Sequence, residues 1–184
     1  FELLSREFAH TRRKNLLLRD LDELVNQQLA KMLFANPQRI DYYDRYQEII
    51  DAYNAEQNRA TIEKTFMDLM ELASSLDTEQ QRYVREGFSS DEELSVYDLL
   101  FSENLTKQEI ETIKKVSVDL LTKIKQQIAK LDHWTDKQET KAIVDNLIRN
   151  TLWQELPNSY DVSDIQTYQK KIYEYVYMRY PEVA

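Results

Sequence analysis

Glycine is almost missing from this sequence, because Gly87 is the single one among 184 residues. Tight hairpin turns of types I′ and II′ need residues that tolerate positive φ, which glycine does best. A strand-rich fold with many such turns is therefore disfavoured. A phosphate-binding loop is excluded as well, since it needs several glycines to let backbone amides approach the anion. The sequence thus predicts helices and no nucleotide-hydrolysing site.

Cysteine is absent and histidine occurs only as His10 and His133. Disulfides and thiolate metal ligands are therefore excluded. The two histidines lie far apart and have no second nitrogen ligand at helical spacing, so the usual zinc-type site is not expected. Nucleophile elbows and Cys–His pairs are missing too. We predict no catalytic, metal-ligating or cofactor-binding residue in this chain, and no small-molecule substrate.

Long apolar runs are also lacking, since no stretch approaches the roughly 18 residues that a membrane span requires. The N-terminus carries no basic, apolar and small-residue signal pattern. Phe1 opens directly into a helical pattern, from which we expect the chain to be a piece of a longer protein. No membrane contact is predicted.

Charge is abundant but unevenly placed. The net charge of −9 discourages contact with nucleic acid, which depends on Lys and Arg meeting phosphates. From Asp91 to Glu103, however, five acids meet no base, whereas from Asn104 to Arg149 nine bases oppose seven acids. One polar face is therefore expected to be locally basic on an acidic protein.

Helix starts are marked at four points by a hydroxyl residue three positions before Glu or Gln, the spacing of a capping box. These pairs are Ser90 with Glu93, Thr106 with Glu109, Thr135 with Gln138, and Ser163 with Gln166. Apolar residues recur at helical spacing along the whole chain. The predicted fold is all-α, an irregular bundle of about six to eight helices with no significant sheet.

Asn36-Pro37 divides the chain, because the residue before proline is pushed out of the helical region. Residues 1–35 are interpreted as the end of a preceding helical region or an N-terminal helical arm, and residues 36–184 as the main helical domain. A helix is expected over residues 59–75 and a short one over 78–86. Gly87 follows at the position where a left-handed residue closes a helix.

Three further motifs allow more than one interpretation each. Asp132, Asp136 and Glu139 are spaced to hold magnesium, but acids are favoured at a helix start by its macrodipole, and we prefer that structural interpretation. A magnesium nuclease stays the enzyme alternative. Trp134, between two helices, is interpreted as a junction plug rather than a platform for ligand stacking. The cluster Arg12-Arg13-Lys14 is either a solvated face, an arm buried by a neighbour, or a phosphate contact.

Four blocks in order carry a family resemblance: NPQRIDYYDRYQEIIDAYN, VREGFSSDEELSVYDLLF, LTKQEIETIKKVSVDLLTKIK and WTDKQETKAIVDNLIRNTLWQELPNSYD. They resemble the C-terminal region of the motor (R) subunit of type I restriction-modification enzymes, over about residues 36–180. The resemblance implies a bacterial, cytoplasmic subunit that translocates and cleaves DNA using ATP and magnesium. Its nuclease and helicase domains would lie N-terminal to the present chain.

The resemblance further implies a non-catalytic region that attaches the motor to the methyltransferase core subunits and lies beside the DNA path. Candidate contacts to the DNA backbone, independent of sequence, are Lys114, Lys115, Lys123, Lys137, Lys141 and Arg149. Candidate partner or junction-packing residues are Trp134, Gln138, Asn146, Trp153, Glu155 and Leu156. The alternative is a general helical protein-interaction module with no nucleic-acid role, which lysines neutralised by neighbouring acids would favour.

Overall fold

The computed structural model describes residues 2–56 and 58–181, and these form nine α-helices, one 3₁₀ turn and no strand. The all-α prediction is confirmed. The helix count exceeds the expected six to eight because residues 2–35 form two helices, α1 (Glu2–His10) and α2 (Lys14–Ala35). Residues 1–85 and residues 86–184 cluster into two compact units. The start of the first helix at Phe1 lies outside the described residues.

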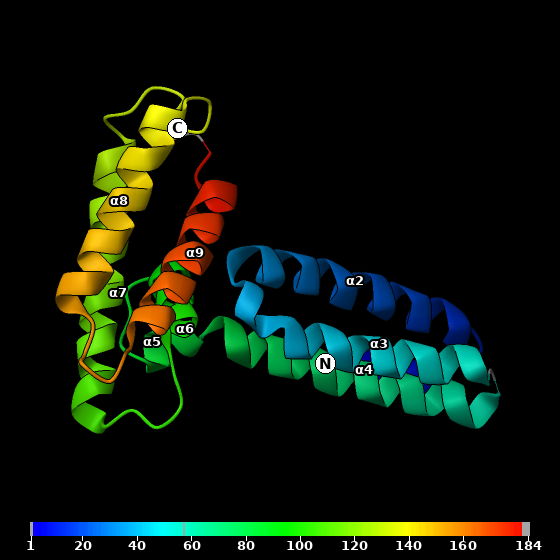
Figure 1. The fold of residues 1–184 in the computed structure, drawn as a ribbon. Coiled ribbons are helices and arrows are strands. Elements are labelled where there is room, and N and C mark those ends of the chain that lie inside the picture. Colours follow the sequence, from blue (N-terminus) through cyan, green and yellow to red (C-terminus); the bar gives the residue numbers. More distant parts are fainter. Residues whose placement is uncertain (1, 57, 182–184) are drawn as a thin grey trace. The chain divides into compact units, whose positions relative to one another are not determined.

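The first unit is built on α2, α3 (Ile40–Ala55) and α4 (Arg59–Gln80), which run side by side (Figure 1). Its core comes from apolar positions that recur every three or four residues on α2 and α4. The fully buried members are Val25, Leu29, Phe66, Leu69, Leu72, Ala73 and Leu76. Burying several large side chains of this kind contributes about 1.5–3 kcal/mol each to folding.

The turn between α2 and α3 follows from Asn36 and Pro37. The Asn36 side chain accepts a hydrogen bond from the Gln38 amide at 3.1 Å and starts the short 3₁₀ turn Pro37–Arg39. Buried Arg39 then reaches the Glu79 carboxylate, with 2.9 Å between Nε and Oε1. The expected end of the third helix at Ser75 is wrong: α4 continues to Gln80, because Leu76 and Glu79 are both buried on its inner face.

Within the first unit, α2 packs on α3 and α4, and the boundary expected between residues 35 and 36 stays a prediction. The assignment of residues 1–35 to a preceding region of a longer protein stays a prediction. The first unit ends with the single-turn helix α5 (Arg82–Arg85). Gly87 follows with φ of +84°, the left-handed conformation expected of it.

The second unit contains α6 (Asp91–Leu100), α7 (Lys107–Ile128), α8 (Gln138–Glu155) and α9 (Val162–Arg179) (Figure 1). Helix α7 packs against α6 and α8, and α9 packs against α8 and α6. The fully buried side chains at their centre include Leu94, Leu100, Ile113, Leu120, Ile124, Val144, Ile148, Leu152, Ile172 and Val176. The core of this unit therefore draws on all four helices.

Two of the four predicted helix starts are confirmed. The Ser90 hydroxyl accepts from the Glu93 amide at 3.3 Å, and Thr106 and Glu109 form a complete capping box. The start at Thr135 is wrong: α8 begins at Gln138 without a side-chain cap, and the Thr140 hydroxyl instead donates to the Trp134 carbonyl at 2.7 Å. Because Trp134 is buried, its packing determines where α8 begins, and the capping-box spacing of Thr135 and Gln138 does not.

The start at Ser163 is also wrong. The box of α9 lies two residues earlier, where the Asp161 carboxylate accepts from the Asp164 amide at 2.8 Å and Asp164 accepts from the Asp161 amide at 3.1 Å. Aspartate is as good an N-cap as serine, so Asp161 caps the helix in place of Ser163. None of the helices in residues 2–56 and 58–181 is long and apolar enough to cross a membrane.

Removing the Thr106 cap tests the local account of α7. We expect Thr106→Ala to lower the free energy of unfolding by about 1 kcal/mol, because the Glu109 amide loses its acceptor and the Glu109 carboxylate loses the hydroxyl that donates to it. The measurement is urea unfolding followed by circular dichroism. The matched control is Thr122→Ala on the same helix, whose hydroxyl donates to the Val118 carbonyl at 2.8 Å and caps no helix start. Equal losses in both variants would contradict the assignment.

Candidate interaction surface

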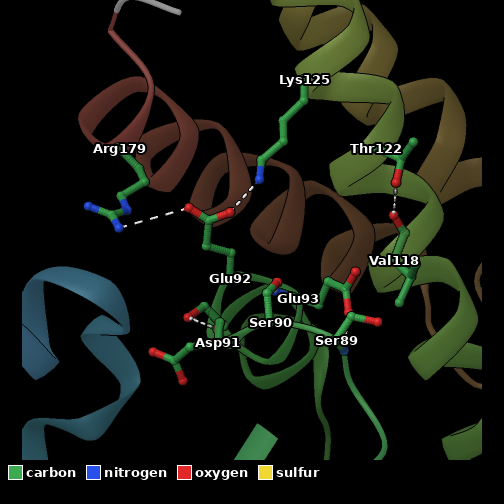
Figure 2. Close-up of polar contacts among 10 residues, drawn as sticks. Ser89, Ser90, Asp91, Glu92, Glu93, Val118, Thr122, Lys125 and Arg179 are labelled. Atoms are coloured by element: carbon green, nitrogen blue, oxygen red, sulfur yellow. Dashed lines mark hydrogen bonds and ion pairs between the residues drawn. The ribbon is translucent and has the colours of Figure 1, made fainter. Parts of the chain in front are cut away.

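One carboxylate holds three helices of the second unit together. Glu92, in the first turn of α6, receives Lys125 from the last turn of α7, and Arg179 at the end of α9 approaches its other oxygen at 3.9 Å (Figure 2). The Lys125 ammonium also lies 5.3 Å from the centre of the Tyr180 ring. Sequence reasoning missed this role of Glu92, because its partners lie far along the chain.

Two of the six candidate DNA-contacting residues are engaged in the same way. Lys114 donates to the Glu86 carbonyl at 3.0 Å and to its carboxylate at 3.2 Å, and lies 5.9 Å from the ring centres of Phe88 and Tyr97. Lys123 pairs with Glu155 at 2.5 Å between Nζ and Oε1, which ties α7 to α8. These two lysines stabilise packing within the unit.

The other four candidates are more available. Arg149 donates to Asn146 Oδ1 at 2.8 Å, and the Lys141 ammonium lies 5.8 Å from the centre of the Tyr177 ring. Lys115 and Lys137 are exposed and form no ion pair with any residue that the structure describes. The predicted basic face is therefore divided between cations held by acids and cations open to solvent.

Trp134 is 1% exposed and closes the turn between α7 and α8. Its indole N–H donates to the Tyr180 carbonyl at 2.6 Å, and its ring meets Tyr173 and Tyr177 edge-on, with centroids 6.2 and 5.7 Å away. No face of the indole is left for a stacked ligand. Among the other candidates, Gln138, Asn146 and Trp153 are exposed, whereas Glu155 and Leu156 are half-buried.

A shallow groove of about 340 Å³ lies over α8 and α9, lined by Lys141, Tyr173, Glu174, Tyr177 and Met178. Met178 is 64% exposed at its edge. The buried Trp134 packs against the rings of Tyr173 and Tyr177 on one side of α9. Tyr and Met are enriched at protein interfaces, so the groove has the composition of a contact surface.

The three acids considered as magnesium ligands lie at the surface of the second unit. Asp132, Asp136 and Glu139 are all exposed, and Asp132 approaches His133 Nε2 at 3.5 Å. Within the described parts of the chain, no group of three or more histidine or acidic side chains is arranged to hold a metal ion.

Several tyrosine hydroxyls of the second unit have pKa values raised above the ordinary value. Burial raises the pKa of Tyr160, whose hydroxyl donates to the Leu100 carbonyl at 2.8 Å, and burial likewise raises the pKa values of Tyr175 and Tyr180. Hydrogen bonds from Thr106 lower the pKa of the Glu109 carboxyl. These groups keep their ordinary charge near neutral pH, because the tyrosines stay neutral and Glu109 stays ionised.

Together these features define a class: a helical protein of two units, with ion pairs between its helices and with aromatic and basic side chains on its surface. A family model described as type I restriction enzyme HindI endonuclease subunit-like, C-terminal, matches residues 2–180. The chain belongs to this family, which confirms the resemblance inferred from the sequence and extends it over α1 and α2. No match is found among curated proteins or among solved structures.

Removing the Glu92 carboxylate tests the link among the three helices. We expect Glu92→Gln to lower the free energy of unfolding by about 1 kcal/mol at low salt, because Lys125 and Arg179 lose a shared partner, and by less at 1 M NaCl. Chemical unfolding at both salt concentrations provides the measurement. Glu111→Gln, an exposed acid of α7, is the control and should change little. A loss independent of salt would argue against an ionic contribution.

The buried tyrosines predict a loss of stability at alkaline pH. A pKa raised in the folded state stabilises the fold below the unfolded value near 10, and this contribution disappears as pH rises above it. Tyr160→Phe should therefore cost about 1 kcal/mol at pH 7 and make the decline above pH 10 shallower. Tyr43→Phe, at a residue 38% exposed, is the control for urea unfolding at each pH. Parallel declines would contradict the assignment.

Proposed function

We propose that this region attaches the motor of a type I restriction endonuclease subunit to the methyltransferase core subunits in the bacterial cytoplasm. In this proposal the longer subunit uses ATP and magnesium to translocate and cleave DNA. The present region supplies no catalytic group and holds the components in place. The match of the family model over residues 2–180 is the observation on which the proposal depends.

Exposed aromatic and sulfur side chains of the second unit support a protein contact. Trp153, near the end of α8, is 48% exposed, and Met178 stands at the edge of the α8–α9 groove. Trp and Tyr side chains carry much of the binding energy at interfaces, because they bury a large area with little loss of rotamer freedom. A partner covering these positions would bury apolar surface that the unit itself leaves in water.

Association with the methyltransferase subunits tests this surface. We expect Trp153→Ala with Met178→Ala to weaken association of the longer subunit about tenfold or more, as loss of interface anchors does. Met67→Ala, at a methionine 63% exposed on α4, is the matched control. Unchanged association after deletion of the whole region would sink the proposal. Unchanged association in the double variant alone would remove only this surface.

Contact with the DNA backbone is the second part of the proposal. Lys115, Lys137 and Arg149 support it, because they are exposed and no carboxylate among the described residues is paired with them. Such binding is independent of sequence. The alternative is a helical protein-interaction module without a nucleic-acid role. It is favoured by the net charge of −9 and by the ion pairs of Lys114 and Lys123.

Salt-dependent DNA binding separates the two. Lys115→Gln, Lys137→Gln and Arg149→Gln together should weaken duplex binding and reduce the slope of log affinity against log salt by about one for each phosphate that is no longer neutralised. Lys123→Gln is the control, because Glu155 already neutralises that ammonium. Unchanged affinity and slope in the triple variant would leave the protein-interaction alternative.

A further inference from the structure

The strongest unassigned charge cluster lies in the first unit, where two helices begin at the same end. Lys14, the first residue of α2, reaches Glu63 near the start of α4, with 2.6 Å between Nζ and Oε1. Helix α1 covers the same place, since its Phe8 ring stacks on Phe66 of α4 with centroids 3.7 Å apart. The turn between α1 and α2 therefore lies beside the first turns of α4.

This end is rich in bases. Residues 3–14 and 58–64 together contain six Lys or Arg residues and two acids. One of these acids, Glu63, is shared by Lys14 and by Arg59, whose Nε lies 3.3 Å away. Hydrogen bonds from Lys14, then from Arg59, lower the pKa of the Glu63 carboxyl and keep it ionised. One negative charge thus faces two positive ones.

Two neighbouring arginines have no acidic partner among the described residues. Arg12 and Arg13 are exposed in the turn between α1 and α2, and neither forms an ion pair with any residue in the described ranges. The Arg13 amide donates to the Thr11 hydroxyl at 3.1 Å, which helps to hold the turn. Guanidinium groups present paired N–H donors that match the geometry of a phosphate. The end of the unit therefore offers an excess of positive charge in a form suited to phosphates.

We propose that Arg12, Arg13, Lys14 and Arg59, which we call the arginine corner, bind the sugar–phosphate backbone of duplex DNA. The choice of DNA among polyanions rests on the proposed function. The inference adds a DNA-binding point in the first unit, separate from the lysines of α7 and α8. Because an arginine here reads a phosphate and not a base edge, the binding is independent of sequence.

The first test measures binding of the full 184-residue chain to a duplex of mixed sequence at several salt concentrations. Arg12→Gln with Arg13→Gln should weaken binding about tenfold at low salt and reduce the salt slope by about two. The matched control, Lys31→Gln with Arg45→Gln, removes the same charge from exposed positions elsewhere in the unit and should have a much smaller effect. Equal effects of the two pairs would overturn the proposal.

A second test predicts a gain. Glu63→Gln frees Lys14 and Arg59 from their shared carboxylate, so duplex binding should tighten about threefold or more and the salt slope should steepen. Glu71→Gln, which frees exposed Arg45 from an ion pair of 2.8 Å, is the control and should have little effect. Weaker or unchanged binding of the Glu63 variant would overturn the arginine corner.

Two other partners are outcomes of the same experiment. If the Arg12 and Arg13 substitutions reduce binding to phosphatidylglycerol vesicles and leave duplex binding unchanged, the corner meets a membrane and the proposal is wrong. If they reduce association with the methyltransferase subunits alone, the corner is a protein contact and the proposal is wrong too. Neither result depends on Trp153 and Met178, so failure here is distinguishable from failure of the assembly proposal.

Discussion

Carboxylates shared between two cations hold the ends of the helices in both units. Glu79 receives Arg39 and Arg82, Glu92 receives Lys125 and Arg179, and Glu63 receives Lys14 and Arg59. A chain without cysteine has no disulfide to fix its connections. Ion pairs between residues distant in sequence join its helices instead. Burial of the apolar side chains supplies most of the favourable free energy of folding.

The three carboxylates differ in what their loss would do. The side chains of Arg39 and Glu79 are only 4% and 10% exposed, so their ion pair lies largely out of water. Breaking a buried pair by removing one partner costs roughly 3–5 kcal/mol, although the intact pair adds little net stability. Glu63 is 44% exposed, and solvent screens its ion pairs. Glu79 therefore has a structural role, whereas the loss of Glu63 would mainly change the charge of the surface around it.

Sequence reasoning succeeded where the signal is local. The scarcity of glycine and the apolar period predicted the helices, and Ser90 and Thr106 cap their helices because cap and partner are three residues apart. Thr135 carried the same signal, but the buried Trp134 set the turn through its packing on α9. Tertiary packing overrode the local preference there, and the interpretation of Trp134 as a junction plug did not specify where α8 begins.

The candidate lysines show the same limit for the site. Lys114 and Lys123 lie on the polar side of a helix and look alike in the sequence, yet their acids stand 28 and 32 positions away. Only the packing of α7 reveals that these charges are already matched. Lys115 and Lys137 carry the same pattern and remain open to solvent. Periodicity thus predicts which lysines face outward, but it does not say which of them are neutralised.

An acidic protein that contacts DNA must do so with a small part of its surface. The net charge of −9 repels a duplex from most directions, and this repulsion acts at distances up to about 8–10 Å at physiological salt. A local excess of arginine then attracts the DNA backbone to one place on the surface. The acids elsewhere exclude other orientations. Uneven charge therefore favours one approach direction more strongly than a uniformly basic surface, at the expense of overall affinity. On this argument, the acids of the first unit would contribute to orienting the DNA as well as to solubility.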